Sequence, residues 1–456
     1  MSISGQQISP QSRTHFVPKN LGVLLFLCLF ILVFILYYIT NNATVYKRPI
    51  LYPAWIHTEP RQLACGLPVQ SDPIIKVNGR KAYTVGSYIE HRFGRKIIRT
   101  IGIMLRSEDN EYTCLLCCNN QTVSVTGSYK IHSDHFGYDY GTVYIDCEIP
   151  ATCSIPTHIA ITSEKHEEKT SSWNIQFFQP VRNHKTKENF TYNFTVCISV
   201  MYEFKDVLAL VQAMEMYKIL GIRKVAIYKT SCDPHPQMVL DYYVKQGFVD
   251  IIPWTVTSYI TVSRGWQKHI SPGELHYFGQ IAALNDCVYR YMYQSRYVAL
   301  HDMDELILPL KEDNWTELLP RLEKIYQNTA GFEFENNYFP LSISTNQKPE
   351  YAPDLWKQVE GTNFLQHTKR LINDPSVFNN FKVIVNPRSV YKATVHGILE
   401  SRTGTVRVDH NIARMYHMRN ISHIDLSGTQ DTRLWDFANK LIPAVSEVLK
   451  KVFNIQ

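Results

Sequence analysis

The segment with the clearest capacity for chemistry is an acidic stretch at 301–309, with the sequence HDMDELILP. It follows an apolar run at 297–300 that is typical of a buried strand. Residues two apart on a strand point to the same side, so Asp302 and Asp304 are expected to project together from its carboxyl end. Two carboxylates held that close repel each other unless a cation lies between them. The pattern predicts a Mg²⁺ or Mn²⁺ site for a phosphate-bearing substrate, against the competing interpretation of an acidic turn that caps the next helix.

The elements that must position this segment alternate between strand and helix periodicity. Strands are expected at 194–200, 224–228 and 249–254, and helices at 205–220, 237–246 and about 274–294. This order predicts a parallel sheet with helices packed on it, and such sheets bind ligands at the carboxyl ends of their strands. The acidic segment therefore ends a buried strand where a ligand site is expected.

The chain after the acidic segment supplies further strands and a packing helix. A helix is expected at 316–327, strands at 381–385, 393–396 and 413–416, and a C-terminal helix within 429–453 that Pro443 kinks. The polar, irregular stretch at 340–380 suits a substrate loop.

The first 73 residues differ in composition from the rest of the 456-residue chain. Residues 21–40 carry no charged side chain and are long enough for one helical crossing of a bilayer. This predicts a cytosolic tail at 1–20, an uncleaved signal anchor at 21–40 and a proline-rich stem at 41–73. A cleaved signal peptide is the rival interpretation of the apolar segment.

Cysteines and glycosylation sequons are concentrated after the apolar segment and favour an oxidising, luminal environment. Nine of the ten cysteines follow it, and an odd number leaves at least one thiol free or paired between chains. The cluster of Cys114, Cys117 and Cys118 lacks a second pair at zinc-binding spacing, which favours structural disulfides. Glycosylation is expected at Asn120, Asn189, Asn193, Asn314 and Asn420.

Residues 74–190 have strand-like patterns, among them 96–104 and 141–147, and hold most of the cysteines. They predict a small β-rich, disulfide-containing module before the main domain. The net charge of +6 is modest for this length, and no long basic run argues for binding nucleic acid.

Several parts of the chain resemble glycosyltransferase family 92. The stretch at 276–305, which contains HYFGQI, NDC and RYVALHDMDE, resembles the core of that family. KVIVNP at 382–387, VH at 395–396 and HMR at 417–419 are similar to its later segments, and 82–92 is similar to the region before its catalytic part. The resemblance covers roughly 74–430, with one departure: Met418 stands where the family usually has Tyr.

The resemblance implies a single-pass type II Golgi membrane protein with a luminal catalytic domain. That domain is expected to have a GT-A-type, Rossmann-like α/β fold at 191–430, followed by a packing helix at 431–456. The implied reaction is an inverting, metal-dependent transfer of galactose from UDP-galactose in β linkage onto a glycan, with galactose or fucose of an N-glycan as acceptor. The implied partners are the nucleotide-sugar donor, a glycan or glycoprotein acceptor and the membrane, with Mn²⁺ or Mg²⁺ as cofactor.

The resemblance also assigns roles to individual residues. The expected metal ligands are Asp302, Asp304 and His417, with His396 as the alternative to His417. The residues expected to contact the donor are Asp302, Glu305, Gln280, Asp286 and Arg419. The competing interpretation is that Gln280, Asp286 and the neighbouring Asn285 are simply polar residues on the surface of a helix. An inverting transfer needs a carboxylate base, and four are left open: Glu333, Glu335, Asp354 and Asp374.

Three other classes compete for the same acidic segment. A phosphohydrolase would need a small residue four positions after Asp302, where Leu306 stands. A calcium loop would need more acidic ligands and a central glycine. A non-catalytic, luminal glycan-binding protein with a transferase fold is the alternative function, and the intact acidic motif argues against it.

Overall fold

The structure is a computed structural model, and it describes residues 29, 31–33, 63–70, 72–109, 111–163, 177–343, 353–421 and 428–455. The chain divides into two compact units, Met1–Pro60 and Arg61–Gln456. All strands and α-helices named below belong to the second unit. The predicted cytosolic tail and much of the predicted stem lie outside the described residues.

The predicted membrane helix at 21–40 also lies outside them, apart from Leu29 and 31–33. In the part of the chain that the structure describes, no helix combines the length and the apolar character that a membrane crossing requires. The predicted spanning helix, and the type II Golgi membrane location and membrane partnership that depend on it, are therefore corrected: the described residues give them no support.

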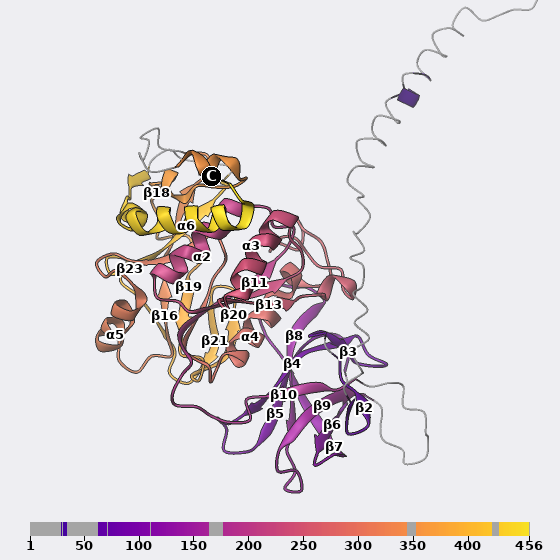
Figure 1. The fold of residues 1–456 in the computed structure, drawn as a ribbon. Helices are drawn as coiled ribbons and strands as arrows, with labels where there is room; N and C mark the ends of the chain where they lie inside the picture. The colour runs from indigo at the N-terminus through magenta and orange to yellow at the C-terminus, as the bar shows by residue number, and fades with distance from the viewer. Residues whose placement is uncertain are drawn as a thin grey trace, which may run out of the picture. The chain divides into compact units, whose positions relative to one another are not determined.

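The predicted GT-A-type, Rossmann-like fold class is also wrong. Strands dominate the described residues, which contain 24 strands and five α-helices (Figure 1). The alternating strand and helix pattern that suggested a parallel α/β sheet covers only 192–300. After that point the chain forms short strands, most of which pair antiparallel, a pairing that needs no crossover helix between the strands.

An eight-stranded sheet forms the first part of the unit, in the order β10-β9-β6-β7-β8-β5-β4-β3. Its strands are β3 (Ile75–Lys76), β4 (Ala82–Glu90), β5 (Ile97–Leu105), β6 (Tyr112–Cys118), β7 (Gln121–Ile131), β8 (Tyr140–Glu148), β9 (Pro156–Thr162) and β10 (Gln179–Arg182). Neighbours pair antiparallel, but β10 also pairs in parallel with β4, which closes the sheet on itself. A small hairpin of β1 (Leu63–Ala64) and β2 (Leu67–Pro68) precedes it.

A seven-stranded mixed sheet forms the second part, in the order β13-β12-β11-β14-β19-β16-β22. Its strands are β11 (Tyr192–Met201), β12 (Lys224–Lys229), β13 (Val249–Pro253), β14 (Ser295–Leu300), β16 (Gly331–Phe334), β19 (Lys382–Val385) and β22 (Thr405–Arg407). The first four in spatial order are parallel, and β19 is antiparallel to both of its neighbours. The carboxyl ends of β11, β12 and β14 therefore share one edge.

Both faces of this sheet are buried, and its side chains alternate between them as strand geometry requires. Val196 and Ile198 of β11 face the core with α2 (Val207–Ile219) and α6 (Ala438–Phe453), and Figure 1 shows α6 lying beside α2. Cys197 faces the other core, with α4 (Gln280–Arg290) and the closed sheet. The remaining α-helices are α3 (Pro234–Lys245) and α5 (Trp315–Ile325).

Three smaller sheets complete the unit. The largest joins β15 (Glu305–Pro309), β17 (Asn336–Pro340) and β23 (Ala413–Arg419), with β23 in the middle. The two others pair β18 (Lys369–Leu371) with β24 (Gly428–Gln430), and β20 (Val390–Thr394) with β21 (Gly397–Ser401). Single 3₁₀ turns lie at Val256–Ser258, His276–Gly279, Asp354–Gln358, Phe364–Gln366 and Arg433–Phe437.

Four disulfides confirm the structural use of the cysteines. Three lie in the closed sheet or join it to β1–β2, namely Cys65–Cys117, Cys114–Cys147 and Cys118–Cys153. The fourth, Cys197–Cys287, ties β11 to α4. Among the described cysteines, Cys232 alone is free, as the odd number requires.

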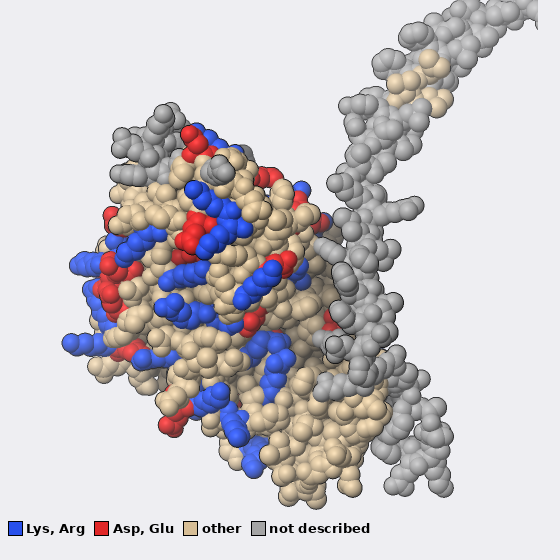
Figure 2. Space-filling view, viewed as in Figure 1, with Lys and Arg blue, Asp and Glu red and all other residues tan. Residues whose placement is uncertain are grey.

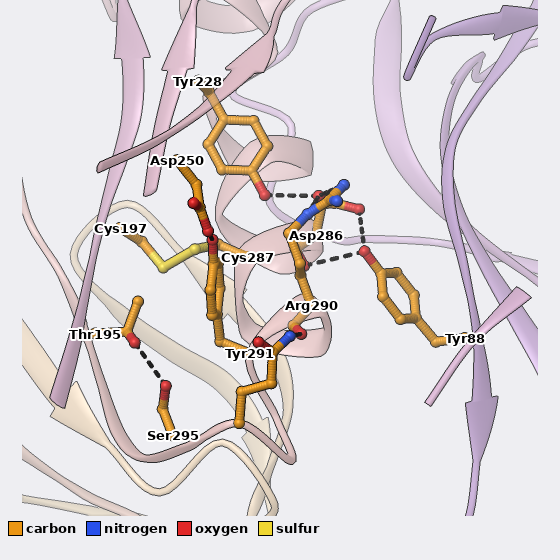
Figure 3. The surroundings of a disulfide bond; sticks show 11 residues. Tyr88, Thr195, Cys197, Tyr228, Asp250, Asp286, Cys287, Arg290, Tyr291 and Ser295 are labelled. Carbon is orange, nitrogen blue, oxygen red and sulfur yellow. Dashed lines mark hydrogen bonds and ion pairs between the residues drawn. A yellow bond between two sulfur atoms is a disulfide. The ribbon is translucent and has the colours of Figure 1, made fainter. Parts of the chain in front are cut away.

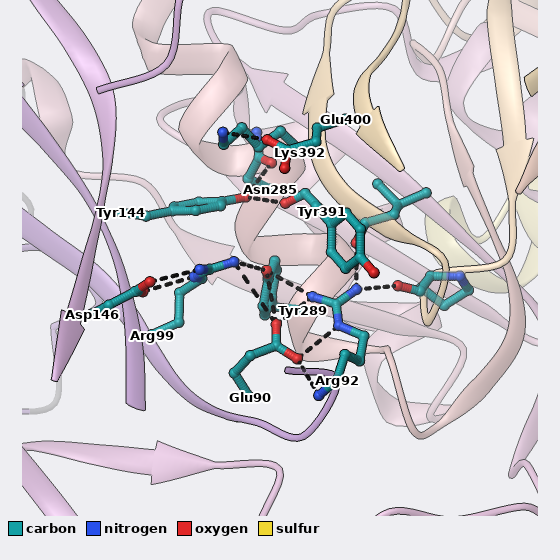
Figure 4. Close-up of polar contacts among 12 residues, drawn as sticks. Glu90, Arg92, Arg99, Tyr144, Asp146, Asn285, Tyr289, Tyr391, Lys392 and Glu400 are labelled. Carbon is teal, nitrogen blue, oxygen red and sulfur yellow. Dashed lines mark hydrogen bonds and ion pairs between the residues drawn. The ribbon is translucent and has the colours of Figure 1, made fainter. Parts of the chain in front are cut away.

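Buried polar contacts join the closed sheet to α4. Arg92 and Arg99 both donate to the hydroxyl of Tyr289 on α4, at 2.8 and 3.0 Å (Figure 4). Glu90, whose side chain is inaccessible to solvent, pairs with Arg92 at 2.5 Å.

Elsewhere, basic and acidic side chains are interspersed over the face drawn in Figure 2, which agrees with the absence of a long basic run in the sequence.

Candidate functional site

The acidic segment leaves the carboxyl end of β14 at the edge where β11 also ends. Parallel pairing aligns Leu300 of β14 with Cys197 of β11, so the residues that follow the two strands lie near the same edge. The side chains of Asp302 and Asp304 are 38% and 46% exposed there. The turn is fixed by Glu305, whose carboxylate accepts a hydrogen bond from the Asp302 amide at 2.7 Å.

Strand β23 brings His417 to these carboxylates. β15 and β23 pair antiparallel with Glu305 opposite His417. His417 Nε2 lies 3.3 Å from Asp304 Oδ2, and its Nδ1 lies 3.5 Å from Glu305 Oε1. Met418, which replaces the Tyr usual in the family, is buried in the core, and its amide donates to the Asp304 carbonyl at 3.0 Å. This contact is made by the backbone, so it does not depend on which side chain stands at 418.

Lys382 completes the cluster, although it is not among the site residues expected from the sequence. β19 pairs antiparallel with β14, which brings the first residue of β19 to the carboxyl end of β14. Lys382 Nζ lies 2.9 Å from Asp302 Oδ2 and 3.4 Å from Glu305 Oε2. Its side chain is only 3% exposed. A lysine at the start of an otherwise apolar strand is a weak signal, because its partner is 80 residues away in sequence.

The charges in this acidic cluster (Asp302, Asp304, Glu305, Lys382 and His417) shift each other's pKa values. Burial alone would raise the pKa of Asp302, but the ammonium of Lys382 outweighs it and keeps that pKa low. Burial raises the pKa of Glu305 to about 7, against the opposing effect of Lys382. Burial alone would lower the pKa of His417, but Glu305 and Asp304 raise it above its ordinary value. The cluster thus holds an imidazole between two carboxylates.

Asp304 and His417 fit two ligands of one divalent ion. Adjacent ligands of an octahedral ion at 2.0–2.1 Å are about 3 Å apart, close to the separation of the two side chains. Within the described residues, no three His, Cys, Asp or Glu side chains are arranged to hold a metal ion by themselves. Asp302 is instead neutralised by Lys382. The residues therefore fit an ion whose remaining ligands come from substrate and water, which is common for Mg²⁺.

His396 and Arg419 lie at the margins of the cluster. His396 is half-buried between β20 and β21, and its pKa is lowered to about 4, first by burial and then by the charge of Lys382. The charges of Asp302 and His417 also act on it, so it lies close to the cluster. Arg419 ends β23 and is exposed.

The four predicted base candidates separate by environment. Asp354 and Asp374 lie on exposed turns, where they bind Lys357 and Ser376. Glu333 accepts a hydrogen bond from Thr405 at 2.5 Å. Glu335 is half-buried, directly before β17, and its carbonyl accepts a hydrogen bond from Met415 of β23 at 2.9 Å. It therefore adjoins the strand that carries His417.

The predicted donor-binding residues of α4 bind protein partners instead. Asp286 is inaccessible to solvent and accepts hydrogen bonds from Tyr88 at 2.5 Å and Tyr228 at 2.6 Å, beside the Cys197–Cys287 disulfide (Figure 3). Asn285 accepts one from Tyr144 at 2.6 Å, and Gln280 donates to Ser199 of β11 at 2.8 Å. These side chains hold α4 between the two large sheets.

Four of the five predicted glycosylation sites lie on the surface: Asn120, Asn189, Asn193 and Asn420 are exposed. Asn314 is half-buried and caps α5 by accepting a hydrogen bond from the Glu317 amide.

Comparison with known proteins agrees with the resemblance. The family model of glycosyltransferase family 92 matches residues 192–451, which contain the whole acidic cluster. The chain is 26% identical over 202 residues to glycosyltransferase family 92 protein F13G3.3 of Caenorhabditis elegans, covering 44% of this chain and 37% of that protein. It is 19% identical over 353 residues to beta-1,4-galactosyltransferase galt-1 of the same organism, covering 74% of each chain.

The extent of these matches differs between the relatives. The chain spans 37% of the length of F13G3.3, and 27% of glycosyltransferase family 92 protein C33H5.2, to which it is 23% identical over 141 residues. The family match itself covers more than half of this chain. The chain therefore belongs to glycosyltransferase family 92.

Proposed function

We propose that the chain moves galactose from UDP-galactose onto a glycan, with inversion to a β linkage. The observation that carries this proposal is the pair of Asp304 and His417, 3.3 Å apart at the carboxyl edge of the mixed sheet. The donor sugar is taken from the galactosyltransferase galt-1, which aligns with most of the chain. The acceptor we propose is galactose or fucose of an N-glycan.

Asp304 and His417 would hold Mn²⁺ or Mg²⁺ together with the donor's diphosphate. When bound, the ion would neutralise the charge of the leaving nucleoside diphosphate. Asp302 keeps its charge because Lys382 pairs with it, and its exposed oxygen can accept hydrogen bonds from the ribose hydroxyls. Glu305 is too buried to contact the nucleotide-sugar donor. It orients the turn by accepting a hydrogen bond from the Asp302 amide.

The acceptor hydroxyl needs a carboxylate that removes its proton as the new bond forms. We assign this role to Glu335, because it is half-buried beside β23. Asp354 and Asp374 lie on exposed turns, and Glu333 is bound to Thr405 and Arg407. Glu335→Gln should lower kcat with little change in the affinity for UDP. An unchanged kcat would exclude Glu335 as the base.

A donor screen tests the proposed reaction. The purified full chain would be incubated with individual UDP-sugars and a pool of N-glycans, with Mn²⁺ or with EDTA, and the glycans weighed by mass spectrometry. We expect one added hexose from UDP-galactose, only with Mn²⁺. Mass gain on the acceptor separates transfer from donor hydrolysis. If folded protein transfers no sugar from any donor, the proposed function is wrong and the glycan-binding alternative is favoured.

A further inference from the structure

A backbone turn with left-handed geometry directly precedes α4. Tyr277, Phe278 and Gly279 have φ angles of 33°, 54° and 72° in succession. Bulky residues rarely adopt positive φ, and here two of them do so in sequence. Such conformations persist only where the surrounding structure imposes them, and they concentrate at functional sites.

Contacts from three other segments impose this turn. Trp254, which is buried and directly follows β13, donates its indole N–H to the Phe278 carbonyl at 2.7 Å. The Tyr277 amide donates to Ser263 Oγ at 2.8 Å. The ring of Tyr202 stacks on Phe278 with centroids 4.0 Å apart. The turn is thus built into the fold and holds the Tyr277 side chain in one place.

The turn presents a pair of tyrosine hydroxyls near the acidic cluster. The hydroxyls of Tyr202 and Tyr277 lie 3.0 Å apart, and both side chains are half-buried. Tyr202 directly follows β11, the parallel neighbour of the strand that leads to Asp302. Burial raises the pKa of Tyr277, and Tyr202, Asp302 and Asp304 raise it further, so its hydroxyl lies within the electric field of the cluster.

We propose that Tyr202 and Tyr277 bind the nucleoside part of the nucleotide-sugar donor. Adjacent hydroxyls can both donate to and accept from a base edge or a ribose, and tyrosine rings can stack on a base. The diphosphate would then lie at the acidic cluster, so the donor would run along the edge of the sheet from the two tyrosines to Asp304 and His417. This inference rests on the proposed function, because it requires a nucleoside diphosphate donor.

The test is UDP binding by calorimetry with the full chain. Tyr277→Asn removes the ring and keeps the turn, because Asn tolerates positive φ better than most residues. It should raise the Kd for UDP about ten-fold, the loss typical of one stacked base. Tyr277→Phe and Tyr202→Phe remove one hydroxyl each and should raise it about three-fold, the scale of one neutral hydrogen bond. Tyr259→Phe, on an exposed position of a nearby loop, should change nothing.

The outcomes separate this site from the proposed function. If the wild type does not bind UDP, both are overturned. If it binds UDP and all three site variants bind equally well, the nucleoside site alone is overturned. A rise in the KM for the acceptor with an unchanged KM for the donor would also overturn it. Should Tyr277→Asn fail to fold, the two Phe variants decide the matter.

Discussion

Two aspartates lie beside the same mixed sheet. They differ in how many of their carboxylate hydrogen-bonding positions are filled by other protein groups. Asp286 on α4 is inaccessible to solvent and is bound by Tyr88, Tyr228 and Arg290. Asp304, after β14, keeps a side chain that is 46% exposed, with His417 beside it. A carboxylate whose lone pairs are all taken by protein donors stabilises the fold, whereas one that stays open can bind a ligand. Asp286 is therefore an acid that stabilises the fold, whereas Asp304 is an acid that can bind a ligand, although both lie in the stretch at 276–305.

The largest effect on activity should come from a substitution in the acidic cluster. Asp304→Ala should lower transfer on the order of 10³-fold, the scale for losing a group that stabilises charge in the transition state. The unfolding temperature should stay unchanged, because the side chain is partly exposed. Activity assays and calorimetry on the same preparation check this. Asp436→Ala, which removes an exposed acid outside the cluster, is the control. Normal transfer by folded Asp304→Ala would remove Asp304 from the site.

Substitution of the buried Asp286 should have the opposite effect: a loss of stability without a change in donor binding. Asp286→Ala leaves the buried guanidinium of Arg290 without its ion-pair partner, which should cost about 3 kcal/mol in the free energy of unfolding. The KM of the remaining folded enzyme for donor should be unchanged. Denaturant unfolding and donor titration measure the two quantities. A rise in donor KM without loss of stability would mean that Asp286 meets the donor after all.

Lys382 should have an intermediate effect. Lys382→Met leaves Asp302 and Glu305 without the cation between them, so transfer should fall about 10–100-fold, as for other residues that orient a site. Lys392→Met removes a lysine that pairs with Glu400 outside the cluster and should leave transfer intact. Equal rates for the two variants would show that Lys382 does not position the site.

The smallest effect concerns pH. Burial raises the pKa of Glu305 from 4.5 to about 7, so the folded chain holds a proton that the unfolded chain releases between these values. Stability therefore falls as pH rises through this window. Glu305→Gln cannot titrate, and the difference between its profile and the wild type should be about 4 °C in Tm across this window. Calorimetry from pH 4 to 8 with EDTA measures it, and parallel profiles would contradict the assignment.

Much of the local structure followed from sequence periodicity. The strand expected at 297–300 is found at Ser295–Leu300, and the helix expected at 205–220 is found at Val207–Ile219. Both have an unambiguous apolar pattern bounded by polar or capping residues; Asp206, for example, accepts a hydrogen bond from the Ala209 amide. Such signals are local, so a single sequence is enough to detect them.

What the sequence could not reveal depends on pairing between distant strands. The partnership of Lys382 with Asp302 arises because β19 lies antiparallel to β14, and the closed sheet arises because β10 returns to β4. Neither follows from periodicity, which is why the fold class was wrong. Asp286 looked like a donor ligand because the sequence shows its acid but not the tyrosines that bury it, which are 198 and 58 residues away.

The proposed reaction depends most directly on Asp304 and His417 together holding a divalent ion at the donor site. The most direct test is titration of Mn²⁺ into the full chain in the presence of UDP, followed by electron paramagnetic resonance. The wild type and Asp286→Asn should each bind one ion, and Asp304→Asn and His417→Ala should each lose it. Undiminished Mn²⁺ binding by both of the latter variants would contradict the account.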